Sequence, residues 1–206
     1  MKLSTLLCAA LVAVVPAVSS ATSLSTTYAG GNGQNGNMFD VLVGSEDITV
    51  KSFDMNVNNG STIVEFWLKT GSAAGSLTTQ GDWTLMDSVS VTSSGNGSGT
   101  NVDVLDVVLS AGQTYGLYLT TTTGGVAYTN GTAVGNVAAQ NDDLTIYEGW
   151  GKSYAFGSTF SPRVWNGAIN YEVSSNATVP VPASGMLLIG ALAAGGAVAR
   201  RKQLSA

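Results

Sequence analysis

The chain has 206 residues, with eight lysines and arginines, thirteen aspartates and glutamates and no histidine, so its formal net charge at pH 7 is −5. This acidic balance argues against nucleic acid as a partner, because a negative surface repels phosphate groups. With one cysteine and no histidine, the sequence excludes zinc and copper sites built on those side chains, and also Ser-His-Asp and Cys-His catalysis.

Residues 1–21 have the three parts of a secretory signal peptide. Lys2 gives the positive start, Leu6 to Val15 the apolar stretch, and the residues up to Ala21 the small side chains that signal peptidase requires. The apolar stretch is about ten residues long, which is too short to cross a bilayer. We expect cleavage after Ala21, or after Ser19, and the exported part then contains no cysteine and folds without a disulfide.

Residues 22–38 are polar, small and rich in glycine and asparagine. A stretch with so little to bury predicts a flexible lead-in to the folded domain. The exported part, residues 22–180, carries four cations and all thirteen acidic residues, a net charge of −9. Its length is sufficient for one domain with a sizeable core.

Residues 39–174 contain short runs in which apolar side chains recur at every second position, as in half-buried strands. The clearest runs are Phe39, Val41, Val43; Phe53, Met55, Val57; Val64, Phe66, Leu68; and Tyr115, Leu117, Leu119. Asn-Gly pairs at 59–60, 96–97, 130–131 and 166–167 are typical of tight turns in which glycine has a positive φ. About eight to ten strands at this spacing predict an all-β domain, a single β-sandwich of jelly-roll type.

The segment Tyr147–Tyr171 is dense in aromatic residues and contains a lone arginine. Aromatic rings stack on sugar rings, and an arginine can bind hydroxyls or the carboxylate of a uronic acid. Glycines interrupt the segment, which indicates that the first rings lie on loops. The candidate sugar-contact residues are therefore Trp150, Tyr154, Phe156 and Arg163. The alternative, which the sequence favours, is that these rings cap the end of the sandwich core.

Neither a catalytic residue nor a cofactor is predicted. Pairs of carboxylates such as Asp103 with Asp106 could serve a glycosidase, but they lie in no recognisable motif. Calcium is the metal that exported loops would hold, through carboxylate and carbonyl oxygens. Its candidate ligands are Asp142 and Asp143, and Asp40 with Glu46 and Asp47. Because no Asp-x-Asp-x-Asp loop is present, the sequence favours solvated acidic loops instead.

Residues 175–182 are predicted to form a linker with a sorting motif, and residues 183–206 a transmembrane helix with a basic tail. Ala183–Ala199 is an uncharged apolar run of seventeen residues. As a helix it would be roughly 25 Å long, at the short end of a membrane span. The basic stop that follows is expected to stay in the cytoplasm by the positive-inside rule. It consists of Arg200, Arg201 and Lys202.

This tail resembles the PEP-CTERM sorting signal of Gram-negative bacteria, in its VPLPA-type variant. The matching motif is Val179, Pro180, Val181, Pro182, Ala183 and Ser184, with Val181 standing where the variant usually has leucine. The resemblance implies processing near the motif by an exosortase, a transpeptidase-like membrane enzyme, and association with extracellular polysaccharide. An ordinary membrane anchor is the alternative.

The central region, residues 37–173, also resembles an uncharacterised bacterial exported β-sandwich module. The resemblance lies in four phrases: Asn37–Val41, Leu109–Tyr115, Leu144–Gly149 and Phe160–Arg163. No activity is known for that module, so the resemblance implies no site residues.

Together these features predict a non-enzymatic protein of the cell envelope or extracellular matrix. It would be exported, held briefly in the inner membrane by its C-terminal helix, and then processed. Its predicted partners are signal peptidase, an exosortase-type enzyme and extracellular polysaccharide. Two alternatives stay open: a carbohydrate-binding module with a defined sugar site, and an exported glycan-active enzyme.

Overall fold

The computed structural model describes residues 21–58 and 60–174. The predicted linker, sorting motif, transmembrane helix and basic tail lie outside the described residues, as does the predicted signal peptide apart from Ala21. The described part is all-β, with fourteen strands and one short 3-10 helix. Within it, no helix has the length and apolar character needed to span a bilayer.

The 3-10 helix η1 (Gln80–Asp82) lies between the fifth and sixth strands of the described part. In chain order, the strands are β1 (Ala21–Ser25), β2 (Asn32–Gln34), β3 (Gly36–Val43), β4 (Ile48–Met55), β5 (Ser61–Thr70), β6 (Thr84–Thr92), β7 (Thr100–Leu109), β8 (Thr114–Thr121), β9 (Val126–Asn130), β10 (Val137–Gln140), β11 (Leu144–Tyr147), β12 (Gly149–Lys152), β13 (Thr159–Val164) and β14 (Gly167–Val173).

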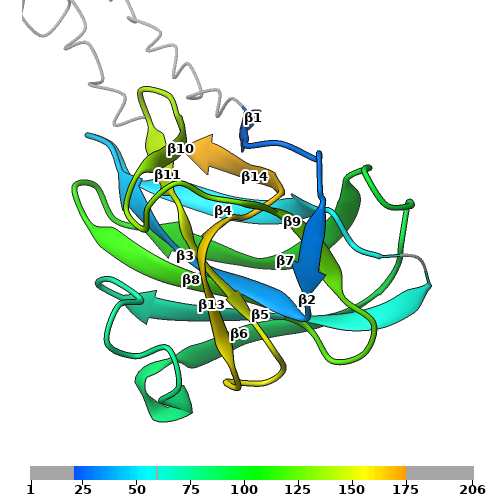
Figure 1. The fold of residues 1–206 in the computed structure, drawn as a ribbon. Helices are drawn as coiled ribbons and strands as arrows, with labels where there is room; N and C mark the ends of the chain where they lie inside the picture. The colour runs from blue at the N-terminus through cyan, green and yellow to red at the C-terminus, as the bar shows by residue number, and fades with distance from the viewer. Residues whose placement is uncertain (1–20, 59, 175–206) are drawn as a thin grey trace, which may run out of the picture. The chain divides into compact units, whose positions relative to one another are not determined.

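The strands form two sheets that pack in layers, as Figure 1 shows. The smaller sheet has the order β1-β14-β4-β7. The larger has the order β2-β9-β13-β12-β3-β8-β5-β6, with β11 also paired to β3 and β10 paired to β11. The alternation expected from the sequence is visible in β7, where buried and exposed residues take turns along most of the strand. The prediction of an all-β domain is therefore confirmed, and the two sheets give it a sandwich-like form.

The main core lies between the sheets and is centred on aromatic rings. Phe39 of β3 stacks on Trp165 with 4.8 Å between ring centroids. Phe53 of β4 meets Phe66 of β5 edge-on at 4.9 Å, so the contact joins the two sheets. All four side chains are at most 2% exposed. Burying each such ring stabilises the fold by about 1.5–3 kcal/mol, so this core is the main source of stability.

A second apolar cluster, which we call the outer cluster, covers the outer face of the larger sheet. The strands supply Met38, Trp67, Tyr118 and Trp150, and segments 71–83 and 153–158 fold over them with Ala73, Trp83, Leu77 and Phe156. As a result β8 is buried on both faces over nearly its whole length. Strands covered on both faces carry apolar residues at consecutive positions, which explains the apolar run in β8.

The expectation that residues 22–38 form a flexible lead-in is wrong. β1 pairs with β14 over five residues, β2 pairs with β9, and β3 begins at Gly36. The polar composition did not predict these strands because they are held by backbone hydrogen bonds, which need few apolar side chains. Glycine also has a packing role here, since a Cβ at Gly36 would lie 2.8 Å from Thr120 Cα on the neighbouring strand β8.

The Asn-Gly pairs fall into two groups. Gly60 and Gly97 have φ values of 115° and 83°, as the sequence predicts. The prediction is wrong for Gly131 and Gly167, which do not have a positive φ. Glycine is required at these two positions because other groups approach too closely for a side chain. A Cβ at Gly131 would lie 3.2 Å from Arg163 N, and one at Gly167 would overlap Trp165.

Candidate functional site

The four candidate sugar-contact residues do not form one exposed surface. Trp150 was expected on a loop but lies in β12, opposite Met38, and is only 8% exposed. The glycines on either side of it permit close packing rather than a loop, because a Cβ at Gly149 would lie 2.9 Å from Phe39 Cα. Phe156 packs edge-on against Trp67 at 5.2 Å and Tyr118 at 5.0 Å. Both rings thus belong to the outer cluster, which agrees with the alternative of core capping.

Tyr154 and Arg163 lie apart from that cluster's interior. Tyr154 is 43% exposed, and its hydroxyl donates to Glu65 Oε1 at 3.1 Å. Arg163, on β13, donates through Nη1 to the carbonyl of Pro162 at 2.7 Å, and its guanidinium lies 5.8 Å from the centre of the Tyr128 ring. Tyr154 is the one candidate whose ring is substantially open to solvent.

Three of the five candidate calcium ligands accept hydrogen bonds from other groups of the protein. Asp40 Oδ1 accepts from Ala73 N at 2.7 Å, so this carboxylate holds segment 71–83 against the sheet. Asp47 Oδ1 accepts from Ala111 N at 2.8 Å, and Asp143 Oδ2 accepts from the hydroxyl of Tyr171 at 3.2 Å. Among the described residues, no three acidic side chains gather into a group that could hold a metal ion.

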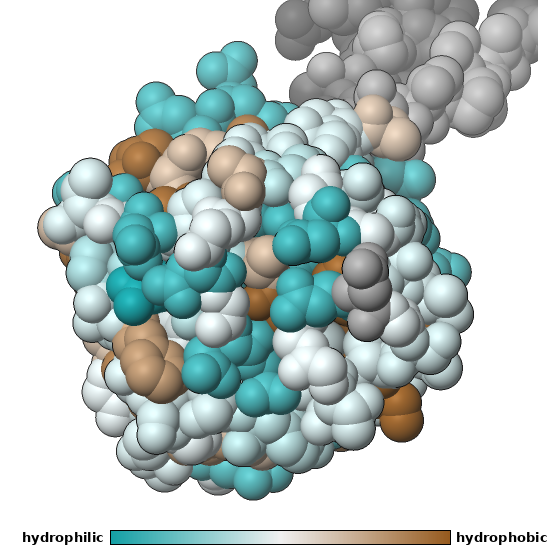
Figure 2. All heavy atoms as spheres, turned by 45° about the vertical axis from the view of Figure 1, so that its right-hand side comes forward, coloured by the Kyte–Doolittle hydropathy of each residue, from teal (hydrophilic) through white to brown (hydrophobic). Residues whose placement is uncertain are grey.

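The structure reveals a pocket that the sequence did not indicate, on the side of the molecule that carries β2 and β9. This side lies to the right in Figure 1 and is turned forward in Figure 2, where strongly hydrophilic residues gather on it. The pocket has a volume of about 440 Å³. We call it the amide pocket, and its lining consists of Gly31, Asn32, Gly33, Gln34, Asn58, Asn96, Gly124, Gly125 and Ala127.

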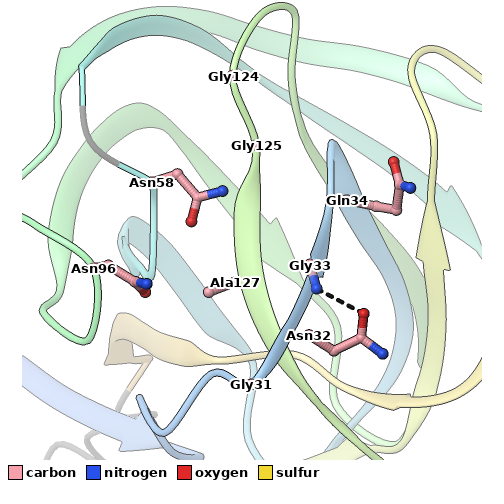
Figure 3. A pocket seen from close by; sticks show the side chains of 9 residues that line it. All are labelled: Gly31, Asn32, Gly33, Gln34, Asn58, Asn96, Gly124, Gly125 and Ala127. Atoms are coloured by element: carbon pink, nitrogen blue, oxygen red, sulfur yellow. Dashed lines mark hydrogen bonds between the residues drawn. The ribbon is translucent and has the colours of Figure 1, made fainter.

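The walls of the amide pocket come from segments far apart in the chain. Figure 3 shows Asn32 and Gln34 of β2 on one side, Asn58 and Asn96 on the other, and the start of β9 between them. β2 is held there by its pairing with β9, in which Gly33 lies opposite Ala127. Asn58 follows β4, and its backbone N–H donates to Gly125 O at 2.9 Å.

Buried Asn56 fixes two of these walls. Its side-chain nitrogen donates to Tyr28 O at 3.1 Å, and its side-chain oxygen accepts from Gly97 N at 2.8 Å. Asn56 is fully buried, so both bonds are sheltered from water. The segment before β2 and the turn before β7 are thereby tied to the same side chain.

Buried Asn166 fixes the N-terminal segment in a second place. Its side-chain oxygen accepts from Gly30 N at 2.8 Å, and its nitrogen donates to Val164 O at 3.1 Å and Thr129 Oγ1 at 3.2 Å. Bonds of this kind each contribute about 0.5–1.5 kcal/mol, and an orphaned partner would cost more. The pocket is therefore preorganised by two buried amides.

The groups that face the pocket are polar but uncharged. Gln34, Asn58 and Asn96 are exposed, and their side-chain amides make no hydrogen bond within the described residues. Asn32 is partly engaged, since its Nδ2 donates to Asn130 Oδ1 at 2.9 Å and its Oδ1 accepts from Gly33 N at 2.8 Å. Each free amide offers two donor hydrogens and an acceptor oxygen. The pocket can therefore hydrogen-bond a ligand but supplies no acid, base or nucleophile.

The position of the pocket follows from the register of the smaller sheet. Ala21 pairs with Glu172, so the two ends of the described chain lie at one end of that sheet. Gly167, at the other end of β14, pairs with Met55 beside buried Asn56. β14 has seven residues, or roughly 20 Å of strand. The amide pocket thus lies at the opposite end of the domain from Ala21 and Ser174.

Comparisons with known proteins add no identification to this geometry. No protein family matches the chain, and no curated protein is similar to it in sequence.

Proposed function

We propose that this chain is a non-enzymatic protein of the cell envelope or extracellular matrix, exported by its signal peptide and sorted by its PEP-CTERM-like tail. The order of the proline-containing motif, the uncharged apolar run and the basic stop supports the sorting step. The observation that carries the binding role is the preorganised pocket lined by neutral amides and glycine backbone. Amides do not titrate near neutral pH, so this lining favours binding over catalysis.

The domain that the tail would deliver is a jelly roll in this proposal. Among the eight strands of the orders β1-β14-β4-β7 and β3-β8-β5-β6, the first four in chain order (β1, β3, β4, β5) alternate as neighbours with the last four (β6, β7, β8, β14). Interleaved Greek keys produce such neighbours, and jelly rolls consist of two of them. The strand order therefore supports the description of the fold as a jelly roll.

The sorting step is tested by mass spectrometry of the protein isolated from cells. The mature protein should lack the residues beyond the motif, and the variant Pro180→Ala with Pro182→Ala should stay in the membrane at full length. The reason is that alanine would let the C-terminal helix extend through the motif, which the prolines prevent. Ser175→Ala is the matched control, since it changes the linker but leaves both prolines.

Two results would contradict this proposal. One is the recovery of peptides beyond Gly185 from the matrix fraction. The other is unchanged processing of the double proline variant.

A further inference from the structure

We propose that the amide pocket is a binding site for an uncharged saccharide chain. This inference rests on the proposed function in one respect, that the exported domain is a binding module. It differs from the aromatic site expected from the sequence, because the pocket lining contains no aromatic ring.

The chemistry of the lining fits sugar hydroxyls. A hydroxyl both donates and accepts hydrogen bonds, and so does a side-chain amide. Each of Gln34, Asn58 and Asn96 can therefore pair with a hydroxyl either as donor or as acceptor. None of these amides is committed to a partner within the described residues. Saccharides present many such hydroxyls at close spacing, which suits three amides around one pocket.

The charge of the domain selects against acidic saccharides. The lining has no cation to pair with a uronic or sulfated group. The exported part as a whole carries four cations against thirteen acidic residues. An anionic chain would therefore meet repulsion over the whole surface without a compensating ion pair in the site. A neutral saccharide chain meets no such electrostatic repulsion.

The dimensions of the pocket fit a short stretch of such a chain. Its volume of about 440 Å³ lies within the range of known ligand sites, about 300–1,000 Å³. Four of its nine lining residues are glycines. At Gly31 and Gly124 the place of a side chain is open, so a ligand can approach the backbone there directly. Because neutral hydrogen bonds to solvent-exposed groups are weak individually, a polymer that engages many copies of the domain would bind far better than one sugar.

The location of the pocket is also suitable. It lies at the end of the domain opposite Ala21 and Ser174, where the chain enters and leaves the described part. The residue at which the tail joins the domain is therefore remote from the pocket, both before and after the proposed processing.

The test uses the full chain, purified in a zwitterionic detergent without a sugar headgroup. Binding is measured against an array of neutral glucans, mannans and galactans, with alginate as the anionic probe. The isosteric double variant Gln34→Glu with Asn58→Asp removes donor hydrogens and adds charge but keeps the shapes of the side chains. We expect the wild type to bind a neutral saccharide and not alginate, and the double variant to bind it at least about tenfold more weakly.

The matched control is Gln80→Glu with Gln113→Glu, which adds the same charge at exposed positions outside the pocket lining. It should bind like the wild type. A second comparison uses Tyr154→Ala, which removes the exposed ring of the outer face and should also leave binding unchanged. Thermal melts of all variants establish that they are folded.

Three outcomes would overturn the inference: no neutral saccharide binds, the pocket variant binds like the wild type, or Tyr154→Ala alone abolishes binding. None of them affects the processing of the tail, which the mass spectrometry measures separately. Failure of the pocket inference and failure of the sorting proposal are therefore distinguishable.

Discussion

Glu148 is a nearly buried carboxylate that holds the turn between β9 and β10. Its Oε2 accepts from Thr132 N at 2.5 Å and Ala133 N at 3.0 Å, and its Oε1 accepts from Thr132 Oγ1 at 3.0 Å. Hydrogen bonds to a charged acceptor are about twice as strong as neutral ones. Gly131 adjoins this carboxylate, since a Cβ at Gly131 would lie 3.1 Å from Glu148 Cδ.

Gly131→Val should therefore destabilise the fold by displacing the carboxylate, not by straining the backbone. We expect the free energy of unfolding to fall by about 2–4 kcal/mol. Gly81→Val is the control, because a Cβ at Gly81 has no neighbour within 4 Å, and it should change the value by less than about 1 kcal/mol. Denaturant titration measures both. Equal effects of the two substitutions would contradict this account.

Lys152 is a fully buried lysine without a carboxylate partner among the described residues. Its Nζ donates to Gly157 O and Thr159 Oγ1, both at 2.7 Å, and so ties down segment 153–158, which carries Phe156 of the outer cluster. Burial lowers the pKa of Lys152 to about 8. A neutral amine still has two hydrogens to donate, so both bonds survive deprotonation.

This burial predicts a pH dependence of stability. Because folding lowers the pKa of Lys152, the unfolded chain binds more protons between about pH 8 and the ordinary lysine value of 10.5. Stability should then rise with pH, by roughly 1–2 kcal/mol from pH 7.5 to 9.5. Buried Tyr118, whose pKa is raised by burial, acts in the opposite direction only above its ordinary value of 10.0.

Denaturant titrations across this pH range test the prediction. The rise should be absent in Lys152→Met and present in Lys51→Met. Lys51 is the matched control because its hydrogen bond to Asp106 raises its pKa, so it stays protonated throughout the range. A rise that persists in Lys152→Met would assign the effect to another group.

At the scale of elements, β6 and β7 are the last strands on one side of the two sheets and so have unpaired edges. β7 also exposes two large apolar side chains, Leu105 at 66% and Val108 at 60%. Such an edge is a template for pairing with another chain. Asp87 of β6 blocks it in part, because its Oδ2 accepts from Leu105 N at 2.8 Å.

Asp87→Ala should therefore increase aggregation. The substitution frees the N–H of Leu105 and removes a charge from the edge, and both changes favour pairing between copies. Asp87→Asn is the matched control, because its side-chain oxygen can still accept the bond. Light scattering during gentle heating should show earlier aggregation for Asp87→Ala than for Asp87→Asn or the wild type. Identical onset in all three would show that the edge is protected by other means.

The sequence predicted some elements well and others not at all, for physical reasons. Period-two apolar patterning located β3, β4, β5 and β8, since these strands face a core. β2 and β12 gave no such signal, because their sequences, Asn-Gly-Gln and Gly-Trp-Gly-Lys, use glycine where backbones or rings pack closely. Core capping by Trp150 was foreseen, but the sequence did not show which segments fold over the outer face of the sheet.

The amide pocket was beyond the reach of sequence patterning. Its walls join Gln34, Asn58, Asn96 and Gly125, which become neighbours only through the pairing of β2 with β9 and through the bonds of Asn56. Asparagine and glycine in such segments are also what ordinary turns contain. Only the three-dimensional arrangement distinguishes side chains that face a pocket from those that close a turn.

At the scale of the whole molecule, stability should come from the two apolar clusters alone. The exported part has no cysteine. Three of the five carboxylates considered as calcium ligands, those of Asp40, Asp47 and Asp143, accept hydrogen bonds within the domain. Thermal midpoints should therefore agree within about 2 °C with and without a reducing agent, a chelator or added calcium. For a domain of this size, a change of about 1 kcal/mol in the free energy of unfolding shifts the midpoint by roughly 2–4 °C. Phe156→Ala serves as the positive control, because it opens the outer cluster and should lower the midpoint by several degrees. If calcium instead raised the midpoint by more than about 5 °C, a bound ion would be part of the folded state, and the carboxylates of Asp142 and Asp143 would be the first to substitute.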